Sequence, residues 1–221
     1  MNPTPSASSM FDVGSSTFNV PPAWDLSLLH QINTAWSHPV LDWLMPALSA
    51  IEAWLPLIII AVLLTAWRGG KHGRVMLLCL TIALGLGDGV ISNTLKKTIG
   101  RVRPRDAMEG VIVRDLGTAS PAFMRLFEKP VVKASEPRGE TRGKSFPSSH
   151  TANMFAAATV IACFYRRAGM LMYLLAAAVA YSRIYCGAHW PSDIPPSMAL
   201  GVLVGLGVVT VVRRTMKPTN H

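Results

Sequence analysis

The chain has 221 residues, of which 50% are hydrophobic and only 15% are charged. Soluble domains carry about 25% charged residues, so this composition excludes an ordinary soluble domain and indicates a membrane protein. The net charge is +9, which in a soluble protein would suggest nucleic acid as a partner. Here the basic residues lie between long apolar runs, so membrane orientation and lipid phosphates explain them better, and no nucleic-acid partner is expected.

The N-terminal part of the chain divides into a polar tail and a mixed segment. Residues 1–23 are rich in Ser, Thr, Asn and Pro and contain no Lys or Arg. They lack the basic start and apolar core of a signal peptide and are predicted to be disordered, ahead of one membrane domain over residues 24–221. Trp24–Leu48 alternates apolar and polar residues, which predicts an amphipathic helix in the membrane interface, with a sixth, protein-shielded span as the alternative.

Five apolar runs are candidates for helices that cross a bilayer, which takes about 20 residues. The second and fifth runs are long enough, whereas the others need flanking residues or a thin bilayer. The predicted fold class is all-α, a polytopic membrane helical bundle of five to six transmembrane helices with an N-terminal interfacial helix. The sequence does not indicate the oligomeric state. The five runs are Trp54–Trp67, Val75–Leu95, Thr151–Tyr165, Met170–Tyr185 and Ile194–Val212.

The short loops between these runs predict the orientation of the bundle. Basic residues follow the first, third and fifth runs, and with five spans these three groups lie on one side, which the positive-inside rule makes cytoplasmic. The segments Lys96–Ser149 and Arg183–Asp193 then share the extracytoplasmic face of a multi-pass protein of the plasma (inner) membrane. The basic residues are Arg68, Lys71, Arg74, Arg166, Arg167, Arg213, Arg214 and Lys217.

The loop over residues 105–146 is longer than connections usually are. It carries apolar positions among charges of both signs. We expect it to form a partly ordered extracytoplasmic cap over the site, where substrate specificity would reside.

The first group of unusual residues stands at the exit of the second run. Lys96 and Arg103 are seven residues apart, so they would share one face of a persistent helix. Pro104 biases Arg103 away from helix, and the chain is expected to turn there. Both cations suit a phosphate, because Arg offers a planar fork of donors and Lys a point charge. Taken alone, the pair is better explained by side chains that snorkel to the interface.

The second group is Pro147–His150, at the start of the third run. Ser at a helix start is an ordinary N-cap. A helix N-terminus also presents free N–H groups and a positive dipole end, which together can hold an oxyanion. His150 at this position can reach an oxygen bound there.

The third group runs from Ser182 and Arg183 to His189 and Asp193. A helical turn between His189 and Asp193 would let the carboxylate hold one imidazole nitrogen and leave the other free to attack. Asp193 also precedes two prolines at the start of the fifth run, so it can serve as that helix's N-cap as well.

Taken together, these three groups resemble the motifs of the type-2 phosphatidic acid phosphatase (PAP2) family. Its first motif is similar to the segment in which Lys96 is followed, after six residues, by Arg103 and Pro104. Its second motif, usually Pro-Ser-Gly-His, is similar to Pro147–His150. The third group matches the third motif in both spacings. The one departure is Ser149 in place of the usual Gly, which we expect to alter rate or substrate choice rather than abolish activity.

The resemblance implies a role for each matched residue. His189 would be the nucleophile that forms a phosphohistidine, with Asp193 orienting it and His150 as the general acid for the leaving group. A second set would bind the phosphoryl oxygens and stabilise the transition state. The resemblance implies no cofactor and no metal. The phosphate-binding set is Lys96, Arg103, Ser148, Ser149 and Arg183.

The function predicted is a membrane lipid phosphatase that hydrolyses a phosphomonoester or diphosphate of a lipid, for instance polyprenyl diphosphate, lipid A or a phosphoglycerolipid. The sequence leaves two alternatives open, a lipid phosphotransferase on the same scaffold and a non-catalytic membrane scaffold or transporter. Two neighbours of the motifs receive other roles: Arg101, outside the spacing, is expected to contact headgroups or solvent, and Trp190 is a candidate contact for the substrate headgroup.

Overall fold

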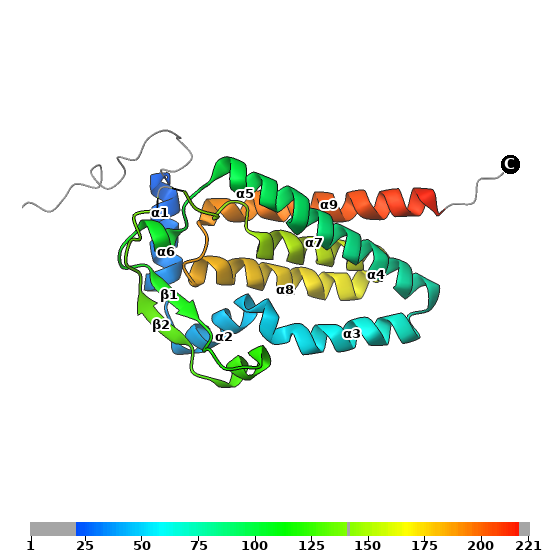
Figure 1. Ribbon diagram of the computed structural model, residues 1–221, viewed down its shortest axis with the longest axis horizontal. Helices are drawn as coiled ribbons and strands as arrows, with labels where there is room; N and C mark the ends of the chain where they lie inside the picture. The colour runs from blue at the N-terminus through cyan, green and yellow to red at the C-terminus, as the bar shows by residue number, and fades with distance from the viewer. Residues whose placement is uncertain (1–20, 141, 217–221) are drawn as a thin grey trace, which may run out of the picture.

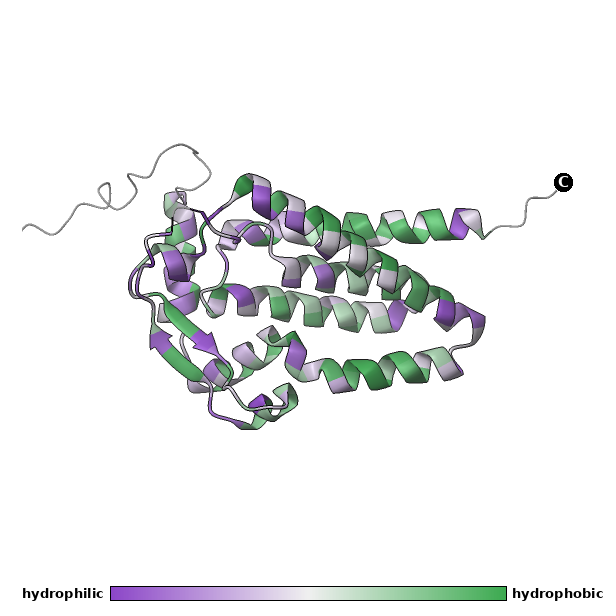
Figure 2. Ribbon diagram, viewed as in Figure 1, coloured by the Kyte–Doolittle hydropathy of each residue, from purple (hydrophilic) through white to green (hydrophobic). Residues whose placement is uncertain are grey.

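The computed structural model describes residues 21–140 and 142–216, so the predicted tail over residues 1–23 lies almost wholly outside the described residues. Within these ranges the chain is a bundle of helices with one two-stranded sheet at one end (Figure 1). Hydrophobic residues dominate the long helices, whereas hydrophilic residues gather at the two ends (Figure 2). The predicted all-α membrane helical bundle is therefore confirmed.

Helix α7 (Ser149–Phe164) lies at the centre of the bundle. It packs against α4 (Gly70–Leu84), α8 (Arg166–Tyr185) and α9 (Ile194–Thr215). Small residues allow the close approach of α9, because a Cβ added to Gly205 would meet the Thr159 side chain at 2.9 Å. This is the packing for which membrane helices select glycine.

Four helical segments are long and apolar enough to cross a membrane: Ile51–Arg68, Gly70–Ala107, Arg166–Tyr185 and Pro191–Thr215. The remaining predicted span corresponds to α7, whose 16 residues fall short of that length. The number of spans, five or six, therefore stays a prediction. Helix α3 (Leu55–Arg68) has no buried residue, which suits a helix surrounded by lipid.

The second long segment continues from α4 through a π-helical stretch, η4 (Gly85–Ser92), into α5 (Asn93–Ile99). It ends at Gly100, whose φ of +64° lies in the left-handed region that glycine tolerates best. Arg103 is extended, with φ −74° and ψ 152°, and the short helix α6 (Pro104–Ala107) follows. The predicted turn at Arg103 is thus confirmed.

The segment predicted as one interfacial helix forms two helices instead. A π-helical turn, η2 (Gln31–Ala35), extends α1 (Ala23–His30), and α2 (Pro39–Ser49) begins at a proline, which is favoured in a first helical turn. A 3-10 turn, η3 (Ile51–Trp54), leads into α3. Both helices cover the end of the bundle that carries the sheet (Figure 1). Their position in the membrane interface stays a prediction.

The loop over residues 105–146 contains an antiparallel hairpin. Strand β1 (Ile112–Asp115) pairs with β2 (Val131–Ala134), with Ile112 opposite Ala134, and the 3-10 helix η5 (Ala122–Phe127) lies between them.

Arg114 on β1 ties this hairpin to the bundle. Its Nε donates to Asp42 Oδ1 of α2 at 2.5 Å, and its Nη1 donates to the carbonyl of Tyr185, at the end of α8, at 2.9 Å. The Tyr185 hydroxyl donates to the same Asp42 oxygen at 2.7 Å, and the guanidinium lies 4.2 Å from the centre of the tyrosine ring. The hairpin is thereby anchored beside the segment that carries His189.

Candidate active site

Four helix ends meet at the hairpin end of the bundle: the C-termini of α5 and α8 and the N-termini of α7 and α9. Direct contacts join the two segments that the sequence predicts on one face. Lys96 Nζ donates to Ser149 Oγ, and the Asp193 carboxylate accepts from Arg101 Nη1 at 2.6 Å and from Ser145 Oγ at 2.5 Å. The motifs are therefore assembled into one site.

His189 lies in the short turn between α8 and α9. Gly187, with φ +68°, reverses the chain, and the N–H of His189 donates to the Arg183 carbonyl at 3.2 Å. The imidazole is 2% exposed. Its Nδ1 lies 3.6 Å from Asp193 Oδ2, so the four-residue spacing brings the ring and the carboxylate close together. The segment between them contains a 3-10 turn, η6 (Pro191–Asp193), instead of the full helical turn that the spacing predicts.

Asp193 is fully buried and does not cap α9 with its side chain. Its Oδ2 instead accepts from the Trp190 N–H at 3.0 Å, which closes η6. Asp193 thus occupies the predicted N-cap position of the fifth span, but its carboxylate is turned back towards the His189 loop and makes no capping hydrogen bond.

A second buried carboxylate stands behind the first. Arg101 bridges the two, since its Nη2 donates to Asp25 Oδ2 at 2.9 Å while its Nη1 contacts Asp193. Asp25, in the first turn of α1, also accepts from the N–H of Ser192 at 2.8 Å and from its hydroxyl at 2.5 Å. The prediction that Arg101 contacts headgroups or solvent is wrong, because it is 4% exposed and compensates two buried charges.

The sequence analysis missed Asp25 and Ser145. Asp25 reaches the site from a segment far away along the chain. Ser145 lies two residues before the second motif but contacts Asp193, 48 residues away. The signal that could have pointed to Asp25 is its charge within a segment of interfacial character, where an acidic side chain needs a partner.

The pKa of His189 is lowered from 6.5 to about 4. Burial is the main cause, because a protonated ring would be removed from water; the neighbouring carboxylate of Asp193 opposes this effect, and the charge of Arg183 adds to it. The imidazole is therefore neutral at neutral pH, with a lone pair available.

Three cations surround this ring. Arg103 and Arg183 act electrostatically on His189, and Lys96 acts on both arginines and on His150. Arg183 Nη1 donates to Ser49 Oγ at 2.6 Å. The Nε atoms of Arg101, Arg103 and Arg183 are buried and have no hydrogen-bond partner in residues 21–140 and 142–216. The other nitrogens of Arg101 contact two carboxylates, whereas neither Arg103 nor Arg183 contacts a carboxylate in these residues. Buried polar atoms are rarely left unpaired, and each such atom needs an explanation.

The N-terminus of α7 adds the second motif. Ser148 is the N-cap: its Oγ accepts from Thr151 Oγ1 at 3.0 Å, and its own N–H donates to Ser197 Oγ at 2.9 Å. The ordinary capping interpretation of this serine is thus confirmed. Ser149 and His150 follow in the first turn and are half-buried.

Trp190 is 1% exposed. Its Nε1 donates to the Val102 carbonyl at 2.7 Å, and the Arg101 guanidinium lies 5.4 Å from its ring centre. The prediction that it contacts a substrate headgroup is wrong, because its ring and N–H are used in holding the site together.

The family model of the PAP2 superfamily matches residues 74–217. The chain belongs to this superfamily. The match begins at α4 and extends past the end of α9, so it contains all eight predicted site residues.

Individual relatives match parts of the chain. The lipid A 4'-phosphatase of Bacteroides thetaiotaomicron is 27% identical over 169 residues, which cover 74% of this chain and 66% of that protein. The bacitracin transport permease protein BcrC of Bacillus licheniformis is 44% identical over 64 residues, or 29% of this chain. The chain thus spans about two thirds of the first relative's length and 32% of the second's.

The fold is also that of a known membrane protein. The crystal structure of Aquifex aeolicus LpxE superposes with a TM-score of 0.60 at 23% identity, over 85% of this chain and 96% of that one. At this identity the similarity shows a common fold, and the chemistry of the present chain has to be argued from its own residues.

Proposed function

We propose that this protein is an integral-membrane lipid phosphatase that forms a phosphohistidine on His189. The observation that carries the proposal is that Arg103 and Arg183, beside a neutral buried imidazole, contact no carboxylate in the described residues, and each has a buried Nε without a partner. An unpaired donor in a buried site is costly. Phosphate oxygens would satisfy both donors, because arginine matches phosphate in geometry and charge.

In the first step, the Nε2 lone pair of His189 forms a bond to phosphorus as the phosphorus–oxygen bond to the lipid breaks. Asp193 faces Nδ1 across 3.6 Å, too far for a hydrogen bond, but its negative charge favours the tautomer that carries the hydrogen on Nδ1 and the lone pair on Nε2. His150 gives its proton to the departing oxygen. The guanidinium groups of Arg103 and Arg183 and the ammonium of Lys96 stabilise the charge that develops on the phosphoryl oxygens.

In the second step, water forms a new phosphorus–oxygen bond and passes a proton to His150. The phosphorus–nitrogen bond breaks, its electron pair returns to His189, and phosphate leaves. His150 stands in the first turn of α7, where burial and then the charges of the nearby cations lower its pKa to about 3. The negative charge of a bound phosphate would offset those cations and raise this pKa, so His150 would carry the proton for the leaving oxygen once the substrate is bound. Ser149, bound by Lys96, can add a hydroxyl contact to the phosphate, whereas Ser148 supports the helix start.

The substrate would be a phosphorylated lipid, since the site lies at one end of a membrane bundle. The candidate classes are lipid A, for which a relative is named, polyprenyl diphosphate and phosphoglycerolipid. The basic groups at the other end of the bundle favour an extracytoplasmic site in the inner membrane.

The test is phosphate release by the purified protein over a panel of these three lipid classes, with and without a candidate acceptor lipid. His189→Gln is expected to lower the rate by a factor of about 10⁴ or more, because nucleophile and general acid act as one unit. His30→Gln, on the exposed part of α1, is the matched control and should retain the wild-type rate.

Two outcomes would contradict the proposal. Phosphohistidine that accumulates and reacts with an acceptor lipid, but not with water, would make the protein a phosphotransferase. Phosphate release by His189→Gln at the wild-type rate would leave the membrane scaffold or transporter as the better account.

A further inference from the structure

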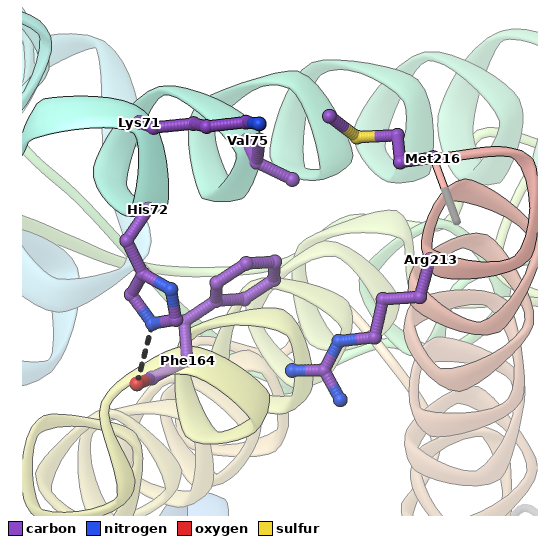
Figure 3. Close-up of a pocket in the computed structure, with 6 residues that line it drawn as sticks. All are labelled: Lys71, His72, Val75, Phe164, Arg213 and Met216. Carbon is purple, nitrogen blue, oxygen red and sulfur yellow. Dashed lines mark hydrogen bonds between the residues drawn. The ribbon is translucent and has the colours of Figure 1, made fainter. Parts of the chain in front are cut away.

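A pocket lies at the end of the bundle opposite the candidate active site. It has a volume of about 400 Å³, within the range of about 300–1,000 Å³ of small-molecule sites. It opens between the start of α4, the corner from α7 to α8 and the end of α9 (Figure 3). Its lining residues are Lys71, His72, Val75, Phe164, Arg213 and Met216.

The corner between α7 and α8 forms a rigid wall of this pocket. His72 Nε2 contacts the Phe164 carbonyl at 3.2 Å (dashed in Figure 3), and because a carbonyl only accepts, Nε2 carries the hydrogen. The ring stands edge-on to Phe164 and Tyr165, with centroid distances of 5.0 and 5.3 Å. His72 therefore shapes the wall of the pocket.

Two cations face the pocket from different helices. Arg213 Nη2 donates to the Cys163 carbonyl at 2.6 Å, and its guanidinium lies 5.1 Å from the centre of the Phe164 ring. This fixes the arginine and leaves its other N–H groups for a ligand. Lys71 extends along the opposite side (Figure 3), and no hydrogen bond or ion pair holds its ammonium within residues 21–140 and 142–216.

Among the described residues, this end contains no acidic side chain that could neutralise these cations. The helices α3, α4, α7, α8 and α9 have neither Asp nor Glu in their sequences. The counter-charge for Lys71 and Arg213 must therefore come from outside the described chain. The apolar side chains of Val75, Phe164 and Met216 on the same walls indicate that the anion is attached to an apolar group.

We propose that this pocket binds an anionic phospholipid of the adjacent leaflet, its headgroup phosphate between Lys71 and Arg213 and its acyl chains along Val75, Phe164 and Met216. Basic pockets between membrane helices are the sites where such headgroups bind. A free phosphate would use the cations but leave the apolar wall in water. The lipid would join the start of α4 to the end of α9, so it would stabilise the bundle without touching the catalytic residues.

The test measures the affinity of the purified protein in detergent micelles for phosphatidylglycerol, by native mass spectrometry and by the rise in Tm. Phosphatidylcholine is the zwitterionic comparison, and sodium phosphate and glycerol 3-phosphate are the soluble comparisons. Lys71→Gln should weaken phosphatidylglycerol binding about fivefold, and Lys71→Gln/Arg213→Gln about fivefold more. The matched control is Arg166→Gln/Arg214→Gln, which removes the same charge from the same end outside the pocket and should bind like wild type.

Lys71→Gln keeps the test independent of folding, because Lys71 makes no contact that the fold requires. Equal weakening in the pocket and control variants would overturn the proposal in favour of general attraction to the surface charge. An equal rise in Tm with sodium phosphate would overturn the assignment to a lipid. Neither result depends on phosphatase activity.

Discussion

Four of the arginines at the candidate active-site end of this bundle divide into two pairs. Arg101 and Arg114 are 4% and 1% exposed and contact buried or half-buried carboxylates, Asp25 and Asp193 for the first and Asp42 for the second. Arg103 and Arg183 lie at the same end but contact no carboxylate within the described residues. Among those residues, no side-chain hydrogen bond is present for Arg103, and Arg183 donates only to Ser49 Oγ.

The difference separates support from ligand binding. A buried charge is tolerated when it is paired, and removal of one partner leaves the other uncompensated. The first pair therefore holds α1, the hairpin and the His189 loop in place. The second pair has no carboxylate partner in the described residues, which agrees with our proposal that it binds the phosphate in a site that folds before its ligand arrives.

The largest expected effect comes from breaking the support. Arg101→Gln leaves Asp25 and Asp193 buried without their cation and should lower the free energy of unfolding by about 3–5 kcal/mol. The measurement is unfolding in detergent micelles, with Arg105→Gln as the control, because its contact with Asp115 is 3.9 Å long and partly exposed and should be worth about 0–1 kcal/mol. Equal stability of the two variants would refute the assignment of Arg101.

The second prediction concerns the unpaired arginines. Arg183→Gln removes a donor for the developing charge and should reduce kcat/KM by about 10²–10³-fold, while the Tm stays within a few degrees of wild type or rises. Phosphate release and thermal unfolding of the same preparation check both halves. A drop in Tm as large as that of Arg101→Gln would place Arg183 in the support instead.

The smallest effect is a pH dependence of stability. The pKa of His189 is about 4 in the folded protein, below its ordinary 6.5, so between these values the unfolded chain binds more protons. The contribution of His189 to the free energy of unfolding is therefore fully present above about pH 6.5 and is lost as the pH falls. The free energy of unfolding should drop by about 1 kcal/mol from pH 6 to pH 5. The difference in unfolding free energy between wild type and His189→Asn isolates this contribution; curves that stay parallel over this range would contradict it.

The comparison of the arginines also shows what could be predicted from sequence. Lys96, Arg103, His150, Arg183, His189 and Asp193 stand at motif spacing, and the alternation of apolar runs with charged loops indicates which segments share a face. Arg101 has no such signature: it is two residues from Arg103, and only the turn at Gly100 and the extended Arg103 direct the two side chains to different partners. Asp25 and Ser145 were missed for the same reason.

Local pattern was therefore sufficient for the helical membrane class, the two faces of the bundle and the residues of the three motifs, because hydrophobic run length and helical spacing act within short stretches of chain. Packing in three dimensions was needed to show which cations are neutralised and which are left open. That distinction depends on carboxylates such as Asp25, which is 76 residues from Arg101 in sequence. Two arginine side chains are chemically identical, and in a buried environment the largest energetic difference between them is whether a carboxylate partner is present.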